Sequence, residues 1–111
     1  MRTICVQFQP KRARGVAIEV VSQLMARTAE SAGVVRTFGV EFAPSRQAWV
    51  NYFFTARYAS PVWAHLKRRA LHHRRLGLAL RDSTIVTCEG SRGWDNYRLL
   101  HHFDPAQILD R

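Results

Sequence analysis

The sequence predicts an α+β fold in which an antiparallel sheet of four or five strands is covered on one face by two helices. Two patterns support this prediction. Short segments alternate apolar and polar residues, which is typical of strands with one buried face, and two longer segments repeat apolar residues at helical spacing. The chain has 111 residues, of which 47% are hydrophobic and 23% charged, and this is the size and composition of one globular domain. We therefore assign residues 1–111 to a single domain.

The first half of the chain is expected to form a strand, a helix and a hairpin. These elements are predicted at 3–9, 11–32, 34–42 and 48–57. Pro10 ends the first strand, Gly33 has the position of a helix C-cap, and residues 43–47 form the turn of the hairpin. The inner face of the helix is expected to carry Ala17, Val20, Val21, Leu24 and Thr28.

The second half is expected to form another helix, two more strands and a terminal segment. The helix begins near Ser60, which can cap it, and ends between Arg75 and Arg81, where Gly77 leaves the boundary open. Its inner face is expected to hold Val62, Trp63, Leu66, Ala70, His73 and Gly77. The remaining elements are strands at 83–89 and 96–103, a turn at 90–93, and a short terminal helix or tail at 104–111.

The resulting order, β-α-β-β-α-β-β, resembles the split β-α-β arrangement of ferredoxin-like domains. The resemblance covers the first six elements. It implies a two-layer sandwich with both helices on one face of the sheet. It implies no function, because this architecture serves many unrelated activities.

The charge of the chain is strongly positive and unevenly distributed. Seventeen Lys and Arg residues against eight Asp and Glu residues give a formal net charge of +9. Residues 57–81 contain seven of these cations and no acidic residue, whereas residues 82–111 contain more acids than bases. A field of this kind attracts polyanions, so nucleic acid or an acidic protein surface is the expected partner.

Basic side chains gather on the outer face of the second predicted helix. The candidate nucleic-acid-binding residues are His65, Lys67, Arg68, Arg69, His72, Arg74 and Arg75. No acidic residue interrupts them to form i,i+4 ion pairs, so an anionic partner would relieve their mutual repulsion. Such a face can lie along a phosphate backbone. The alternative is an ordinary solvated helix face.

Aromatic residues suggest a second kind of surface. Tyr52 and Phe54 are expected on one face of the third strand, and Trp49 and Phe53 on the other. Aromatics on an uncovered sheet face can stack bases or pack against a second copy of the chain, unless the fifth strand or the C-terminal tail covers them. Trp94, in a glycine-flanked loop, can anchor a protein partner. These residues define the alternative function, a protein-interaction module such as a small inhibitor, antitoxin or phage-type regulator.

Two adjacent histidine pairs, His72–His73 and His101–His102, suggest a third hypothesis, a small metal-independent ribonuclease. Neighbouring residues on a helix or a strand do not share a face, so neither pair can act as a unit. A site would need one histidine from each pair, together with Tyr58 or Arg98. We therefore assign no catalytic residue.

Other classes of protein find little support in the sequence. Cys5 and Cys88 are far apart and outside any C-x-x-C spacing, so we expect two buried free thiols and neither a metal site nor a cofactor. No membrane span or secretory signal is apparent, and we expect a cytoplasmic location. The prediction that follows best from the charge is a small nucleic-acid-binding accessory domain that contacts the phosphate backbone through its second helix.

Overall fold

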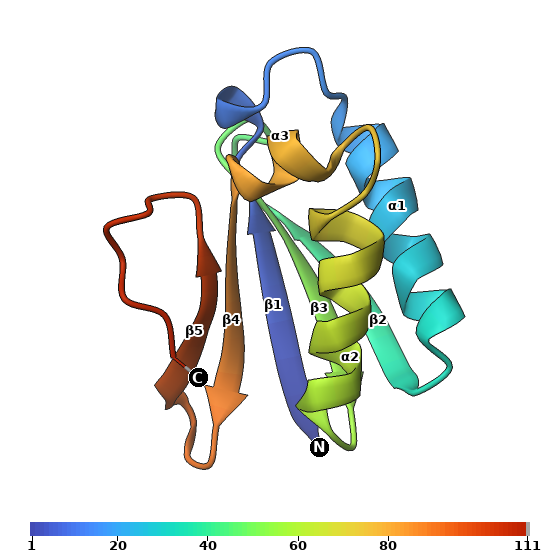
Figure 1. The fold of residues 1–111 in the computed structure, drawn as a ribbon, viewed down its shortest axis with the longest axis vertical. Helices are drawn as coiled ribbons and strands as arrows, with labels where there is room; N and C mark the ends of the chain where they lie inside the picture. The colour runs from blue at the N-terminus through green and yellow to red at the C-terminus, as the bar shows by residue number, and fades with distance from the viewer. Residues whose placement is uncertain (111) are drawn as a thin grey trace.

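Five strands form one antiparallel sheet in the computed structural model, which describes residues 1–110 (Figure 1). The strands are β1 (Arg2–Phe8), β2 (Val35–Phe42), β3 (Val50–Ala56), β4 (Thr84–Gly90) and β5 (Gly93–His102). Their order across the sheet is β2-β3-β1-β4-β5, and each neighbouring pair is antiparallel. The predicted α+β class with an antiparallel sheet is confirmed.

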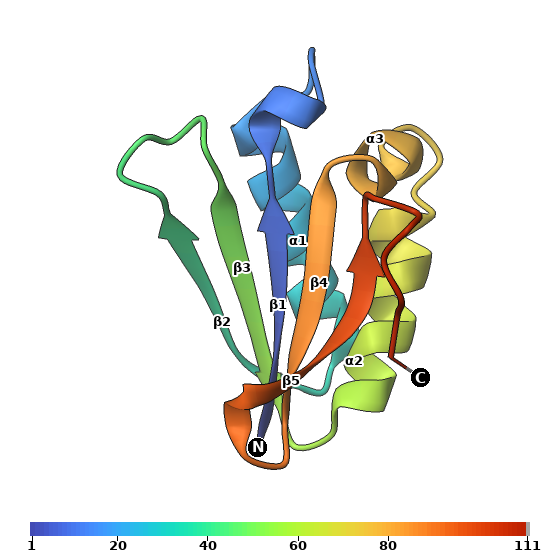
Figure 2. The same cartoon turned by 90° about the vertical axis from the view of Figure 1, so that its left-hand side faces the viewer.

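The helices lie on one face of this sheet, and the other face is uncovered (Figures 1 and 2). The helical segments are η1 (Pro10–Arg12), α1 (Ile18–Ala32), α2 (Ala59–Leu66), the π-helical turn η2 (Lys67–Leu71) and α3 (Gly77–Arg81). Three α-helices therefore replace the two predicted. Among residues 1–110, no helix combines the length and the apolar character that crossing a bilayer requires.

The hydrophobic core lies between the sheet and the helices. Its largest fully buried side chains are Ile4, Phe8, Met25, Tyr52, Phe54, Leu66 and Leu80. Burial of each such side chain stabilises the fold by about 1.5–3 kcal/mol. The hydroxyl of Tyr52 pairs with that of Ser22 at 2.7 Å, which satisfies a buried polar group and joins β3 to α1.

The first predicted helix is shorter than expected and its buried face is rotated. It begins at Ile18 rather than Lys11, because Pro10–Arg12 form a 3₁₀ turn and Gly15 has a positive φ of 81°. Val20, expected inside, is 46% exposed, while the buried residues are Ile18, Val21, Met25, Thr28 and Ala29. The C-cap prediction is confirmed, since Gly33 is left-handed with φ 72°.

The second predicted helix is broken into α2, η2 and α3. Tyr58 rather than Ser60 is the N-cap residue, and its side chain makes no capping hydrogen bond. The helical segment ends at His72, which has φ −115° and ψ 25°. Gly77 then approaches the preceding turn so closely that an added Cβ would lie 2.7 Å from the carbonyl oxygen of Leu71. The single continuous helix expected up to at least Arg75 is therefore wrong.

The C-terminal part of the chain forms a tight hairpin and an extended tail. Only Ser91 and Arg92 separate β4 from β5, so β5 begins at Gly93, three residues before the predicted Asn96. Of the residues that the structure describes, 104–110 contain no helix. The tail bonds to β5 through Asp110, whose N–H donates to the Leu99 carbonyl at 2.8 Å and whose Oδ2 accepts from the Leu99 N–H at 2.7 Å.

Candidate nucleic-acid interface

A basic groove lies between α1 and η2. It has a volume of about 610 Å³ and is lined by Leu24, Arg27, Thr28, Arg68, Arg69, His72, His73, Arg74 and Arg75. We call this set the arginine groove, because five of its nine residues are arginines. Among the described residues that line it, none carries a carboxylate. Five guanidinium groups therefore share one depression with no opposite charge built into its wall.

Three different segments bring these arginines together. Arg27 comes from the exposed side of α1, Arg68 from η2, and Arg75 from the turn that follows His72. His73 holds this turn, since its Nδ1 accepts hydrogen bonds from the backbone N–H groups of Arg75 and Leu76, both at 3.2 Å. The break in the helix thus folds Arg74 and Arg75 back toward α1.

The C-terminal end of a helix is normally unfavourable for anions, because its free carbonyls carry partial negative charge. Arg81 of α3 counters this effect at the end of η2. Its guanidinium donates to the carbonyl of Leu71 and also lies 3.2 Å from Nδ1 of His72. One carbonyl at this helix end is therefore paired with a cation.

His65 lies outside the arginine groove and has a positioning role. Its Nε2 lies 2.8 Å from the hydroxyl of Ser31 on α1, and its Nδ1 accepts from Nη2 of Arg68 at 3.1 Å. Because Nδ1 is the acceptor, the ring proton of neutral His65 is on Nε2 and is donated to Ser31. Burial and the nearby Arg68 and Arg69 lower the pKa of His65, which favours this neutral form. Ser31 is thus an acceptor of this histidine and is not activated by it as a nucleophile.

Lys67 also lies outside the groove, with its Nζ 5.3 Å from the centre of the Trp63 ring. The groove thus contains five of the seven predicted binding residues: Arg68, Arg69, His72, Arg74 and Arg75. Sequence reasoning missed Arg27 and His73. Arg27 was not among the candidate binding residues, and His73 was expected on the inner face of the second helix. The predicted sandwich places both helices on one face of the sheet, but no sequence pattern indicates which of their side chains would meet.

The three predicted partner-binding residues do not form one surface. Phe53 lies at the centre of the uncovered sheet face, beside Cys5 and Gly39 in the neighbouring strands. Trp49 is half-buried in the connection before β3, and Trp94 is 43% exposed at the start of β5. β5 extends the edge of the sheet and leaves the face around Phe53 open (Figure 2).

The uncovered sheet face is polar and contains little positive charge. On the three central strands, β1, β3 and β4, it carries Thr3, Cys5, Gln7, Asn51, Phe53, Thr55, Ile85, Thr87 and Glu89. None of these side chains is Lys or Arg, and Phe53 is the single aromatic one. Bases could stack on Phe53, but these strands provide no cation for the adjoining phosphates.

The histidine pairs are held by separate contacts. Nε2 of His101 bonds to the carbonyl of Arg81 at 2.9 Å, and Nδ1 of His102 accepts the backbone N–H of Asp104 at 2.9 Å. His72 and His73 line the arginine groove, whereas His101 and His102 do not. This groove does not hold one histidine of each pair, as the ribonuclease hypothesis requires.

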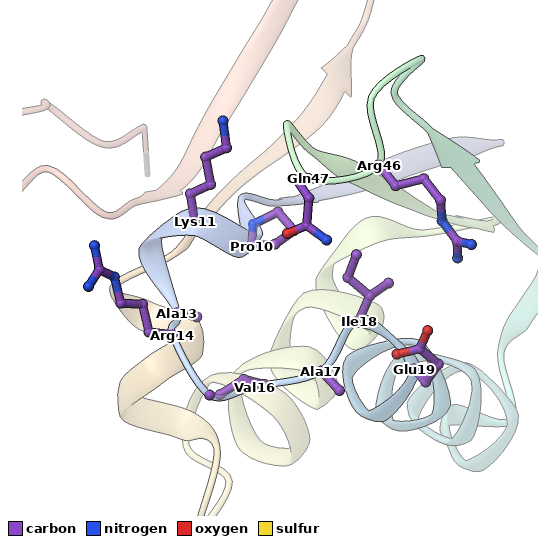
Figure 3. A pocket seen from close by; sticks show the side chains of 11 residues that line it. Pro10, Lys11, Ala13, Arg14, Val16, Ala17, Ile18, Glu19, Arg46 and Gln47 are labelled. Carbon is purple, nitrogen blue, oxygen red and sulfur yellow. The ribbon is translucent and has the colours of Figure 1, made fainter.

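A second depression of about 640 Å³ lies between the loop before α1 and the hairpin connection (Figure 3). Lys11 and Arg14 belong to its lining, but both side chains point away from its centre. The side chains of Gln47 and Ile18 lie closer to it. Arg46 also lines this depression, and its guanidinium lies 4.5 Å from the centre of the Phe42 ring. Lys11 and Arg14 therefore do not converge with it on one point.

The two cysteines are free and buried, as predicted. Burial, aided by the charge of Glu41, raises the pKa of Cys5 to about 12, so this group is a thiol at neutral pH. Burial also raises the pKa of Cys88. Within residues 1–110, no three His, Cys, Asp or Glu side chains are grouped as a metal site would require.

Comparison of the chain with models of protein families, with curated proteins and with solved structures gave no match.

Proposed function

We propose that this protein binds nucleic acid by laying a phosphate backbone in the arginine groove. The observation that carries this proposal is the convergence of Arg27, Arg68, Arg69, Arg74 and Arg75 on one depression of about 610 Å³. Each guanidinium presents five donors and no acceptor, and its planar shape matches two phosphate oxygens. Successive phosphates of one strand would be held by arginines from α1, η2 and the turn after His72.

The charge pattern favours a polyanion over a single small anion. Five cations along one groove give repeated contacts, and each neutralised phosphate adds a salt-sensitive increment of affinity through counterion release. The contacts involve the phosphate backbone and contain no base-reading element, so binding is expected to show little sequence preference. We therefore propose an accessory role rather than recognition of a particular site, and we propose that the protein acts in the cytoplasm.

We also propose that the four strands β2, β3, β1 and β4 form the sheet of a ferredoxin-like fold to which β5 is added at one edge. The strand order and the location of α1 and α2 on one face support this assignment. The break in the second helix is then a local departure from this fold, and it brings Arg74 and Arg75 to the arginine groove.

The alternative, a protein-interaction module, has narrower support. Trp94 is 43% exposed, and an exposed Trp is a common anchor for a partner protein. An acidic protein surface would occupy the same arginine groove as nucleic acid. A homodimer through the uncovered sheet face would instead bury Phe53.

Oligonucleotide binding measured by fluorescence anisotropy over a range of salt concentrations tests the main proposal. Wild-type protein is expected to bind single-stranded or duplex oligonucleotides with an affinity that falls steeply as salt rises. The double variant Arg68→Ala with Arg75→Ala is expected to bind about tenfold more weakly and to lower the salt slope by about 1.5, because two phosphate contacts are lost.

The matched control is Arg14→Ala with Arg36→Ala. Both residues are exposed and lie outside the arginine groove, and the loss of two charges is the same. This control is expected to retain affinity within about twofold. Wild-type binding no tighter than millimolar at low salt, or an equal loss in both double variants, would refute the groove as the binding site.

A further inference from the structure

A second basic pocket lies at the opposite end of the α2–η2 segment. It has a volume of about 510 Å³ and is formed where the start of α2 meets the β4–β5 hairpin, at the lower end of the sheet in Figures 1 and 2. Its lining includes Arg2, Arg57 and Arg98, so we call it the three-arginine pocket. It shares no residue with the arginine groove.

The three arginines reach this pocket from three separate strands. Arg2 begins β1, Arg57 follows β3, and Arg98 lies in β5, where it pairs with Cys88 of β4. Arg2 is fixed in place, since its Nη1 donates to the carbonyl of Gly90 in the hairpin. Both Arg2 and Arg98 lie close enough to Cys88 to favour the charged form of its thiol, although burial outweighs them and raises the pKa. The positive charges of Arg2 and Arg98 therefore both act at Cys88, which lines the pocket.

The backbone at the start of α2 adds hydrogen-bond donors to the same pocket. Ala59 and Ser60 line it, the N-cap residue Tyr58 makes no side-chain capping bond, and the first turn contains no acidic residue. The free N–H groups of a first helical turn favour an anion. The helix start supplements the arginines here and would not by itself define a site.

One acidic residue, Glu89, also belongs to the lining. Its neighbour Cys88 faces the core, so strand alternation places the Glu89 side chain on the uncovered face of the sheet. Its charge still acts on Cys88 alongside those of Arg2 and Arg98, so the lining contains three cations and one carboxylate. The hairpin turn opposite α2 contains two further hydrogen bonds, since Asn96 accepts the N–H of Arg92 at 2.9 Å and donates to Ser91 at 3.2 Å.

We propose that the three-arginine pocket binds a phosphate monoester, the dianionic group found at the end of a nucleic-acid strand and in small phosphate compounds. Three guanidinium groups and the backbone donors of α2 match the charge and the three terminal oxygens of such a group. A phosphodiester inside a strand has one charge and two free oxygens and would use fewer of these donors. This inference goes beyond the proposed function, because the pocket can bind its ligand whether or not the arginine groove binds nucleic acid.

Titration of the ¹⁵N-labelled full chain with inorganic phosphate, followed by NMR, tests this proposal. Saturating shifts are expected at the amides of Ala59, Ser60 and Ser91, with a titration of sodium chloride to equal ionic strength as reference. Arg57→Gln with Arg98→Gln is expected to weaken phosphate binding by about tenfold or more. Arg2 is retained because it holds the hairpin.

The control is Arg68→Gln with Arg75→Gln, which removes the same charge from the arginine groove and is expected to leave phosphate affinity within about twofold. Phosphate shifts that do not saturate, or that are equally strong in the Arg57→Gln, Arg98→Gln variant, would overturn the proposal. A failure of oligonucleotide binding would not affect this result, so the two proposals can fail separately.

The source of the phosphate group is identified by comparing a 5′-phosphorylated oligonucleotide with its 5′-hydroxyl counterpart. Tighter binding of the phosphorylated strand that disappears in the Arg57→Gln, Arg98→Gln variant supports the pocket and assigns it to strand ends. Equal affinity of both strands, with inorganic phosphate binding retained, supports the pocket and assigns it to a small phosphate compound.

Discussion

Two histidines outside the arginine groove are held in their neutral form by their surroundings. Burial lowers the pKa of both, and the cations Arg68 and Arg69 contribute at His65. His101 keeps part of its basicity through the bond between its Nε2 and the carbonyl of Arg81. Each ring links two segments of the chain: His65 joins α1 to η2 through Ser31 and Arg68, and His101 joins β5 to α3.

This arrangement predicts that the protein loses stability on mild acidification. A lowered pKa means that the unfolded chain, with an ordinary value near 6.5, takes up protons before the folded chain does. The free energy of unfolding is therefore expected to fall as the pH decreases from about 6.5 toward the lowered values of the two histidines. Urea unfolding measured at pH values from about 7.5 to about 5 checks this expectation.

The comparison variant is His65→Gln with His101→Gln, which keeps a side-chain N–H donor at each position and removes the titrating ring. Its stability is expected to depend less on pH over the same range. A wild-type stability that is constant or rises on acidification would contradict the assignment of neutral histidines.

At the scale of the elements, the break between η2 and α3 is the feature on which the arginine groove depends. The helix ends at His72, the turn is held by the ring of His73, and Arg81 bonds back to the Leu71 carbonyl. Gly77 allows the chain to pass close to the end of η2, because its α-carbon packs against backbone atoms of Leu71 and His72. The groove depends on this break, since Arg74 and Arg75 lie within the turn.

Gly77→Ala is therefore expected to destabilise the protein by about 1–3 kcal/mol, the usual cost of overpacking a tight site. The added Cβ would lie 2.7 Å from the Leu71 carbonyl oxygen and 3.1 Å from atoms of His72, all backbone atoms that cannot rotate away. Chemical denaturation measures the change.

The matched control for this prediction is Gly39→Ala in β2. A Cβ at Gly39 meets no atom within 4 Å, and its φ is not in the left-handed region. Alanine there is expected to be neutral or slightly stabilising, because it reduces the entropy of the unfolded chain. If both variants lost the same stability, the close approach at Gly77 would not be the cause.

At the scale of the whole molecule, the two faces of the sheet differ in charge. The face with the helices carries the arginine groove and the three-arginine pocket. The central strands of the uncovered face present mainly Thr, Gln and Asn side chains around Phe53. Eight of the seventeen Lys and Arg residues therefore line these two depressions, and under the proposed function nucleic acid is expected to bind on the face with the helices.

This segregation predicts that the uncovered face contributes little to nucleic-acid affinity. Phe53→Ala is expected to change oligonucleotide binding by no more than about twofold, whereas loss of a stacked base contact would cost about 1–3 kcal/mol. Arg27→Ala with Arg69→Ala is expected to weaken binding by about tenfold. Anisotropy titrations at fixed low salt compare the variants. A larger effect of Phe53→Ala than of the arginine pair would move the interface to the sheet.

Sequence patterns predicted the strands better than the helices. Each of the five predicted strands is present, with ends displaced by at most three residues, because alternation reports directly on one buried face. The helical errors have a different origin. The apolar pattern continued through His73 and Gly77 at helical spacing, but the chain turns there. The contacts across this turn, from Arg81 to the Leu71 carbonyl and from Gly77 to the same carbonyl, do not alter the spacing of apolar residues.

The sequence by itself determined the α+β class, the alternation of the strands, the buried cysteines and the concentration of positive charge in residues 57–81. These are properties of short segments and of composition. Only the tertiary structure decided that Arg27 of α1 would join Arg75, and that Arg2, Arg57 and Arg98 would line one pocket. The physical reason is that such groupings arise from helix packing and strand pairing between residues far apart in the chain, for which a local pattern contains no information.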